Sequence, residues 1–199
     1  MLYDCLKSVL SRVFLWLFRC EVSGVENIPR QGGVIIAANH LSNWDPPIAA
    51  AFIPRHVHFM AKQELFDVPL FGAIIRKLHA FPVRRGAADR TAIKSAIKLL
   101  TEGQCLGLFP EGTRSKNGEL RKPEAGLALI ATKAQVPVVP TAVIGTNRIF
   151  SNGSFFPKVK IIYGKPLHID DGALDKAVLQ SFSEQVMLNI DKLIKNSNR

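Results

Sequence analysis

The sequence predicts an α/β fold in a single domain, with a largely parallel sheet flanked by helices. Short apolar runs alternate along the chain with longer segments whose apolar residues recur at helical spacing. The length of 199 residues suits one domain with its own core, and neither an internal repeat nor a low-complexity linker divides the chain. A hydrophobic content of 47% with 21% charged residues is typical of a globular chain and excludes a disordered one.

Each predicted element follows from a local pattern. Apolar runs predict strands at residues 34–38, 57–60, 80–83, 105–109, 137–144 and 159–163. Helical spacing predicts helices at residues 46–52, 90–100, 124–134 and 174–194. Pro46 is expected to open the first of these helices, with Asp45 as its N-cap. Residues 63–78 are expected to form an amphipathic helix or a pair of turns, because Pro69 interrupts them. The buried side of the closing helix is expected to carry Leu174, Val178, Phe182, Val186, Ile190 and Leu193.

The first 20 residues are predicted to form an amphipathic helix that precedes the domain proper at residues 21–195. One interpretation packs this helix on the domain. The other is an interfacial helix, with Phe14, Trp16 and Phe18 entering lipid. Leu15 and Trp16 lie off the main apolar stripe, so the helix is apolar on more than one side. Such a helix can contact its own domain and lipid together, and the sequence leaves both interpretations open.

The chain carries a net charge of +10, with a pI near 9.8. A basic balance points to nucleic acid, anionic lipid or an anionic substrate as the partner. The sequence has no RNP-like motif, zinc-finger spacing or basic-aromatic run, so we do not expect nucleic acid. The remaining candidates are an anionic substrate and an anionic membrane surface, which attracts each nearby basic residue by about 1 kcal/mol.

The cysteine pattern favours a reducing, cytoplasmic setting. The three cysteines, Cys5, Cys20 and Cys105, form no CxxC pair, so neither a disulfide framework nor a zinc site is expected. Cys105 lies in an apolar run and is expected to be a small core residue. The start of the chain lacks the features of a signal peptide, and no stretch approaches the roughly 20 apolar residues of a membrane span.

His40 and Asp45 lie in a polar segment directly after a predicted strand. A neutral imidazole can take a proton from an alcohol near neutral pH. A carboxylate bonded to the other ring nitrogen would fix the tautomer and stabilise the imidazolium that forms. The alternative is that Asp45 only caps a helix and that His40 only makes loop hydrogen bonds. The spacing of the two residues leaves both possibilities open.

Two further polar clusters, FPVRRG at residues 81–86 and FPEGTRS at residues 109–115, also follow predicted strands. Sites in α/β folds form at the carboxyl ends of strands, so we group both clusters with His40. Guanidinium groups can grip a phosphate, and glycine lets backbone N–H groups approach a ligand. Glu111 is expected to order Arg114 or to bind a substrate hydroxyl. For each cluster, a solvated charged turn is the alternative. The candidate residues are Arg84, Arg85, Glu111, Gly112, Thr113 and Arg114.

Several common catalytic patterns are missing. The sequence has no GxSxG elbow, P-loop or GxGxxG, so Ser42, Thr113 and Ser115 have no recognisable nucleophile context. His56 and His58 alternate on a strand-like run without an evident third ligand, so no metal site is predicted.

Four blocks in this order resemble the glycerolipid acyltransferases, most closely the bacterial 1-acyl-sn-glycerol-3-phosphate acyltransferases. The resemblance covers residues 22–165 and includes KQELFDVPLFG at residues 62–72. Each block is weak alone, but the order and spacing of the set are specific. The blocks are NHLSNWD (39–45), FPVRRG (81–86), FPEGTRS (109–115) and VPVVP (136–140).

The resemblance implies roles for single residues, with residues 21–195 as the acyltransferase domain. His40 and Asp45 match the catalytic dyad, and Arg85 matches an arginine associated with glycerol-phosphate binding. Arg84 departs from the family, which often has an acidic or neutral residue there, so either arginine is a candidate phosphate ligand. The residues that match the acceptor-binding block and the proline near the acyl chain are Glu111, Gly112, Arg114 and Pro137.

The implied reaction transfers an acyl group from acyl-CoA or acyl carrier protein to the sn-2 hydroxyl of 1-acyl-sn-glycerol 3-phosphate, giving phosphatidate, without a cofactor. His40 would take the hydroxyl proton, and backbone N–H groups near its loop would stabilise the oxyanion. The expected partners are the lysophospholipid, the acyl donor and an anionic membrane. The expected location is the cytoplasmic face of the cell membrane, peripheral or monotopic, with residues 2–18 and 65–71 resting on lipid.

The sequence leaves two other functions open. Glycerol 3-phosphate or another lysophospholipid could be the acceptor, since phosphate-binding arginines do not define the headgroup. A non-catalytic membrane lipid-binding protein would also explain the basic surface, but erosion of the dyad would be its signature, and His40 and Asp45 are both present.

Overall fold

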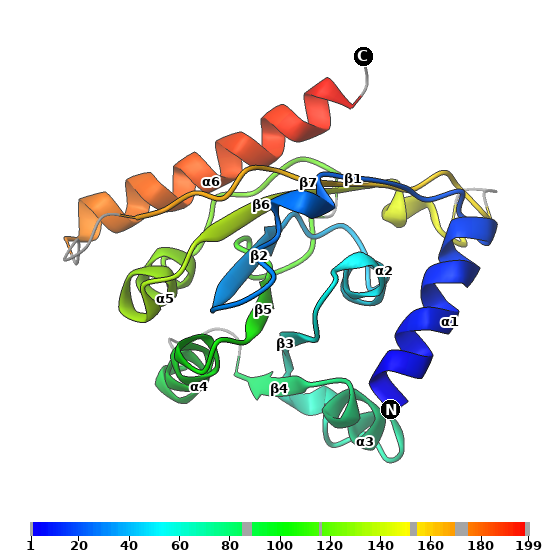
Figure 1. The fold of residues 1–199 in the computed structure, drawn as a ribbon, viewed down its shortest axis with the longest axis horizontal. Helices are drawn as coiled ribbons and strands as arrows, with labels where there is room; N and C mark the ends of the chain where they lie inside the picture. The colour runs from blue at the N-terminus through cyan, green and yellow to red at the C-terminus, as the bar shows by residue number, and fades with distance from the viewer. Residues whose placement is uncertain (1, 85–88, 116, 152–154, 170–174, 198–199) are drawn as a thin grey trace.

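Seven strands form one sheet with helices on both faces, which confirms the predicted α/β class (Figure 1). The structure is a computed structural model that describes residues 2–84, 89–115, 117–151, 155–169 and 175–197. The strands are β1 (Glu21–Ser23), β2 (Val34–Ala38), β3 (Val57–Lys62), β4 (Ala80–Val83), β5 (Cys105–Leu108), β6 (Val138–Ile144) and β7 (Lys160–Tyr163). The helices are α1 (Leu2–Leu17), α2 (Asp45–Phe52), α3 (Phe71–Lys77), α4 (Arg90–Thr101), α5 (Gly126–Ala134) and α6 (Lys176–Asn196), with 3-10 turns η1 (Val25–Asn27), η2 (Gln63–Leu65) and η3 (Thr146–Arg148).

The strand order is β1-β7-β6-β2-β5-β3-β4. Neighbouring strands run parallel except for the β6–β7 pair, so the sheet is largely parallel, as predicted. The strands β6, β2, β5, β3 and β4 therefore end at one edge, which we call the carboxyl edge. The polar segments that follow these strands all begin there, including the loop that carries His40.

Strand β2 divides the core into two layers. All five of its residues are buried, as expected for a parallel strand covered on both faces. Val34 and Ile36 belong to the cluster that packs under α1 and α2, whereas Ile35 and Ala37 belong to the cluster under α4, α5 and α6. Side chains alternate between the faces of a strand, so one continuous apolar run supplies both layers.

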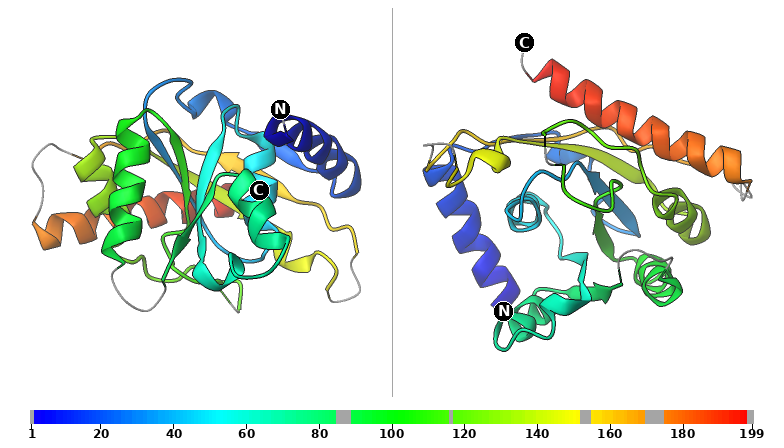
Figure 2. Two further views of the ribbon diagram at one scale, coloured as in Figure 1. Left: turned by 90° about the horizontal axis from the view of Figure 1, so that it is seen from below. Right: turned by 180° about the vertical axis from the view of Figure 1, so that it is seen from behind.

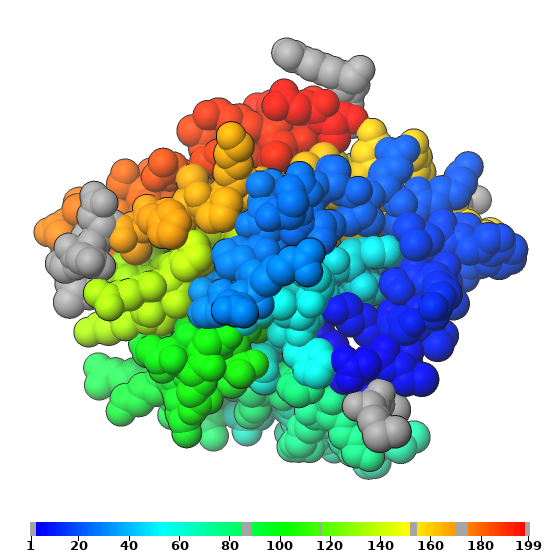
Figure 3. All heavy atoms as spheres, viewed as in Figure 1, coloured from blue at the N-terminus to red at the C-terminus, as the bar shows by residue number. Residues whose placement is uncertain are grey.

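Helix α1 packs on the domain along one side. Phe14 and Phe18 are 3% and 2% exposed and belong to the core, which corrects the expectation that their rings enter lipid. Trp16 is 81% exposed, and Val9 and Leu15 are about half exposed, so the opposite side of the helix faces outward. The space-filling view shows α1, in dark blue, directly against the cyan residues near α2 (Figure 3).

Other local expectations need correction. Strand β1 was not predicted, since its three residues carry no pattern of their own and become a strand by pairing with β7. Of the two alternatives for residues 63–78, the structure has the interrupted one, with η2 and the short helix α3 on either side of Pro69. Val178 is 44% exposed, contrary to its predicted place on the buried side of α6, and Leu174 lies outside the described residues. Cys105 is fully buried, as predicted, and burial raises the pKa of its thiol to about 12.

Three histidines cluster where the start of α1 meets β3 and the end of α3. The ring of His79 lies 5.3 Å from that of His56 and 4.9 Å from that of His58, between ring centroids. His56 Nε2 also lies 2.6 Å from Asp4 Oδ1. Burial, followed by repulsion from the neighbouring imidazole, lowers the pKa of both His58 and His79.

This cluster predicts acid sensitivity of the fold. A histidine whose pKa is lower in the folded than in the unfolded state binds a proton on unfolding, so stability falls as pH drops below the ordinary value of about 6.5. We expect the thermal midpoint to fall less on acidification in His58→Asn than in the wild type. His168→Asn, at an exposed position, is the matched control and should titrate like the wild type. Parallel pH profiles for His58→Asn and the wild type would contradict the assignment.

Candidate functional site

His40 and Asp45 meet at the carboxyl edge, in the loop between β2 and α2. Nδ1 of His40 lies 2.8 Å from Oδ2 of Asp45, and the two residues are 6% and 0% exposed. The same carboxylate oxygen accepts the backbone N–H groups of Leu41 at 2.6 Å and Ser42 at 2.7 Å. The hydroxyl of Thr146 donates to the other oxygen, Oδ1, at 2.5 Å.

The four donors to the Asp45 carboxylate define the tautomer of His40. An ionised carboxylate only accepts hydrogen bonds, so we assign the proton of the His40 ring to Nδ1. The lone pair is then on Nε2, where an imidazole can act as a base. Asp45 is the first residue of α2 rather than its N-cap, which is Trp44, without a side-chain cap bond. The predicted capping role is wrong because the carboxylate turns back onto its own loop.

Phe109 holds the ring of His40 from one side. The two rings are stacked, with centroids 4.0 Å apart and planes 16° apart. Phe109 lies 6.1 Å from Phe59 in a second stacked pair. Gly107, two residues earlier on β5, leaves room for this arrangement, since a Cβ there would lie 2.2 Å from the Phe59 ring. The stack limits rotation of the imidazole and keeps its orientation toward Asp45.

Glu111 supports the backbone of His40. It is 2% exposed, with Oε1 accepting the N–H of His40 at 2.9 Å and Oε2 accepting the N–H of Arg121 at 3.0 Å. Burial raises the pKa of this carboxyl, while the two backbone donors oppose that effect. The carboxylate therefore ties the 109–115 loop to the dyad loop, a role that was not expected from the sequence.

Three backbone N–H groups of the dyad loop already have acceptors. Those of Leu41 and Ser42 donate to Asp45, and that of His40 donates to Glu111. These three groups are therefore engaged, and the identity of the oxyanion donors stays a prediction.

Two residues of the site, Asn39 and Thr146, were not among the sequence candidates. The side-chain amide of Asn39 exchanges two hydrogen bonds of 2.8 Å with the backbone of Val143, which joins the end of β2 to β6. Thr146 follows Gly145, whose φ of +91° and close approach to Lys158 exclude a side chain. Asn39 opens the first block and could have been singled out, whereas no motif marks Thr146.

A cavity of about 760 Å³ opens beside Phe109, between α4, α5 and the ends of β4 and β5. Apolar side chains from both helices and the sheet line most of its wall, including Ile93, Leu127 and Ile130. The candidates Arg84, Glu111, Gly112 and Thr113 also line it. Gly112 has a φ of +66°, which suits glycine. The cavity thus combines apolar walls with a polar group near the dyad, as ligand sites for amphipathic molecules do.

Two further candidates, Arg114 and Pro137, do not line this cavity. Arg114 is exposed and is not among the residues that line it. Pro137 precedes β6 at the opposite edge of the sheet, where its carbonyl accepts the N–H of Ile35. Arg85 lies outside the described residues. Arg84 is exposed, and its Nε donates to the side chain of Gln63 at 2.8 Å.

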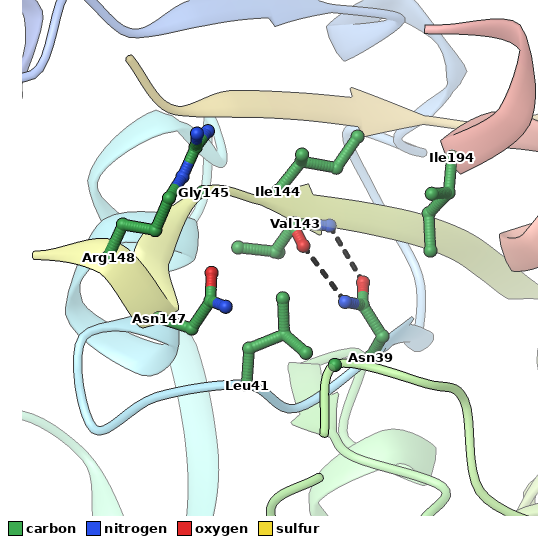
Figure 4. A pocket seen from close by; sticks show the side chains of 9 residues that line it. Asn39, Leu41, Val143, Ile144, Gly145, Asn147, Arg148 and Ile194 are labelled. Atoms are coloured by element: carbon green, nitrogen blue, oxygen red, sulfur yellow. Dashed lines mark hydrogen bonds between the residues drawn. The ribbon is translucent and has the colours of Figure 1, made fainter. Parts of the chain in front are cut away.

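A smaller cavity of about 230 Å³ lies beside the dyad loop (Figure 4). Figure 4 shows the paired hydrogen bonds of Asn39 and Val143 along one side, with Leu41, Asn147 and Arg148 around the hollow. This cavity contains none of the predicted catalytic or substrate-binding residues.

Neither a metal centre nor a membrane span is evident in the part of the chain that the structure describes. Among these residues, no group of three or more His, Cys, Asp and Glu side chains is arranged to hold a metal ion. Within the same ranges, no helix has the length and apolar character needed to cross a bilayer.

Several curated proteins are similar to this chain. A 1-acyl-sn-glycerol-3-phosphate acyltransferase of Bacillus subtilis is 39% identical over 159 residues, which are 77% of this chain and 76% of that protein. A protein of the same name from Borreliella burgdorferi is 28% identical over 190 residues, which are 92% of this chain and 74% of that protein.

A solved structure supports the same relationship. The crystal structure of the 1-acyl-sn-glycerophosphate (LPA) acyltransferase PlsC from Thermotoga maritima superposes with a TM-score of 0.78 at 32% sequence identity. The match covers 96% of this chain and 79% of that one. The profile described as Acyltransferase matches residues 19–144, a span that includes the dyad and the cavity-lining loop. The chain therefore belongs to the acyltransferase family and is an O-acyltransferase.

Proposed function

We propose that this enzyme transfers an acyl group from acyl-CoA or acyl carrier protein to the sn-2 hydroxyl of 1-acyl-sn-glycerol 3-phosphate, giving phosphatidate. The observation that carries the proposal is the buried His40–Asp45 pair beside a cavity that has both apolar walls and polar groups. The acceptor has the same character, with an acyl chain and a phosphate on one molecule. The names of the similar proteins support this choice of acceptor.

The chemistry follows from the tautomer of His40. Nε2 takes the proton of the acceptor hydroxyl as its oxygen attacks the thioester carbonyl. The tetrahedral intermediate then expels the thiolate, which receives the proton from the imidazolium, so an ester and a free thiol are the products. Asp45 stabilises the transient positive charge on the ring. No acyl-enzyme is involved, and no other group needs to exchange protons.

The candidate binding residues divide by location. Arg84 and Thr113, on the cavity wall, together with Arg85, would bind the acceptor phosphate, and Gly112 would allow close approach of the backbone. The apolar wall would take an acyl chain. The other candidates would act indirectly. Arg114 would attract the phosphate from the exposed turn, and Pro137 would act through the position of β6. Glu111 would position His40.

The enzyme would work at the cytoplasmic face of the cell membrane as a peripheral or monotopic protein. Residues 1–20 would serve as the interfacial helix and residues 21–195 as the acyltransferase domain. The outward side of α1 carries Trp16, and residues 65–71 include four large apolar side chains that are at least 39% exposed. Both segments offer apolar surface to lipid, and the net charge of +10 favours an anionic leaflet.

His40→Ala is the direct test of the reaction. We expect the wild type to form phosphatidate from either acyl-CoA or acyl carrier protein thioester in mixed micelles, as detected by mass spectrometry. Removal of the base should lower kcat by about 10²–10⁴-fold without unfolding the protein. An acceptor panel with glycerol 3-phosphate and other lysophospholipids tests the acceptor. Unchanged turnover in a folded His40→Ala enzyme would refute the mechanism.

Thr146→Val tests whether Asp45 needs its fourth donor. The change keeps the shape of the side chain but removes the hydroxyl that donates to Oδ1. A hydrogen bond to a charged group contributes about 1.5–3 kcal/mol, so we expect kcat to fall by about tenfold or more. Thr146→Ser keeps the hydroxyl and should retain most of the activity. Equal loss in both variants would show that packing, and not the hydrogen bond, matters.

Arg84→Gln tests the phosphate site. Loss of the guanidinium should raise the KM for the acceptor by about tenfold and leave the KM for the acyl donor unchanged, because only the acceptor phosphate would be bound there. Arg30→Gln is the control, since Arg30 is also exposed but lies before β2, at the other edge of the sheet. A rise in the donor KM alone would assign Arg84 to the donor instead.

A further inference from the structure

Three phenylalanines that follow β6 form an exposed cluster, which we call the aromatic patch. Phe150, Phe155 and Phe156 are 55%, 66% and 47% exposed. The ring centroid of Phe150 lies 6.4 Å from that of Phe155 and 6.1 Å from that of Phe156. Solvated single apolar residues are ordinary, but a group of adjacent exposed rings marks an interaction surface.

The backbone at the patch is held in an unfavourable conformation. Phe150 has a φ of +54°, in the left-handed region that bulky residues rarely adopt. The strained residue presents its ring outward instead of burying it in the core. Stability of the isolated fold therefore does not explain why a large apolar side chain occupies this position, whereas a ligand that covers the ring would.

Three basic side chains belong to residues that contact the patch or lie two positions from it in the sequence. Arg19, Arg148 and Lys158 are exposed, and the guanidinium of Arg19 donates to the carbonyl of Phe156 at 3.4 Å. The acidic side chain beside them is Glu21, which pairs with Lys158 at 2.5 Å. Aromatic rings flanked by basic groups suit the interface of an anionic bilayer, where rings lie at the headgroup level and cations meet lipid phosphates.

The patch lies at the carboxyl edge and contacts the dyad loop. Trp44, which directly precedes Asp45, has its ring centroid 5.8 Å from that of Phe150. The segment that carries the patch follows β6, and residues 63–70 follow β3, so both begin at the edge where His40 lies. In the left-hand view of Figure 2, yellow η3 and the cyan to teal segment after β3 are at the same end of the sheet.

The patch also contacts the end of α1. The ring of Phe156 lies 6.1 Å from that of Phe18, at the end of this helix, and Val159 donates its backbone N–H to the carbonyl of Phe18. The segment after β6 is thus held against the same helix that carries the exposed Trp16 on its outward side.

The size of the patch favours lipid over a protein partner. At about 200 Å² for a fully exposed ring, the three exposed fractions leave roughly 350 Å² of aromatic surface. A stable protein interface needs about 800 Å² on each partner. A bilayer has no such minimum, since single side chains insert one by one and nearby cations add to the attraction.

We propose that the aromatic patch is a second membrane anchor, which inserts into an anionic phospholipid bilayer and holds the carboxyl edge at the lipid surface. The proposal deepens the proposed function, on which it rests, because the membrane supplies the acceptor. Anchors on both sides of the dyad place the open edge of the site against the surface that contains the lysophospholipid.

Vesicle binding of Phe155→Ser/Phe156→Ser tests the anchor. Vesicles of phosphatidylcholine with phosphatidylglycerol are sedimented with protein, and pure phosphatidylcholine vesicles serve as the uncharged comparison. We expect the double variant to bind the anionic vesicles about tenfold more weakly than the wild type, since two buried rings are lost. Leu188→Ser, on α6, is the matched control because Leu188 is 52% exposed and should not affect binding. Wild-type affinity of the double variant would overturn the proposal.

A fluorescence measurement reports the patch directly. The two tryptophans of the chain are Trp16 and Trp44, so Trp16→Phe leaves only the ring beside Phe150. Bromine-labelled lipid should quench Trp44 in this background and quench it less after the double phenylalanine change. Equal quenching would contradict the proposal. A dimer of the wild type that the double variant converts to monomer, in analytical ultracentrifugation, would also overturn it by assigning the patch to a second copy of the chain.

Two acceptors separate failure of the anchor from failure of the proposed function. With long-chain acceptor in vesicles, the double variant should lose activity in parallel with binding. With a short-chain acceptor that dissolves as monomers, its activity should equal that of the wild type. If the wild type acylates neither acceptor, the proposed function fails, while the vesicle measurements still decide the anchor.

Discussion

The buried carboxylate of Asp45 is the interaction on which the site depends. Removal of a carboxylate from water is costly unless donors replace the lost hydration. Here the replacement comes from two backbone N–H groups, one imidazole and one hydroxyl. These bonds determine the shape of the 40–45 loop, the start of α2 and the tautomer of His40 together. A change in any one of them alters the others.

Glu111 provides a second buried carboxylate, which connects two loops at the carboxyl edge. Glu111 joins the backbone of His40 to that of Arg121, so the segment after β5 is tied to the segment after β2. The cavity wall, with Gly112 and Thr113, directly follows Glu111. The position of His40 and the position of these cavity-lining residues are therefore not independent. This link explains why a carboxylate occupies a buried position at this edge.

The sequence predicted the regular parts of this structure because their causes are local. The apolar run of β2 defines a strand with two buried faces, and the short spacing of His40 and Asp45 lets one loop bring them together. Other features depend on contacts between distant residues. Thr146 meets Asp45 across 101 positions, and Glu111 meets His40 across 71, so no local pattern marks either bond. Helical spacing likewise identified the apolar stripe of α1, but it did not show that Phe14 belongs to the core.

The location of the site at the carboxyl edge would let an amphipathic acceptor reach it along apolar surface. The dyad is nearly closed to solvent, yet it lies at an edge bordered by exposed apolar side chains on both sides. A lysophospholipid that stayed in contact with apolar surface would avoid most of the cost of exposing its chain to water, about 0.8 kcal/mol for each methylene. Its phosphate would meet Arg84 while its chain followed the apolar wall toward α5. The same edge thus suits entry from a lipid surface and exclusion of water from the base.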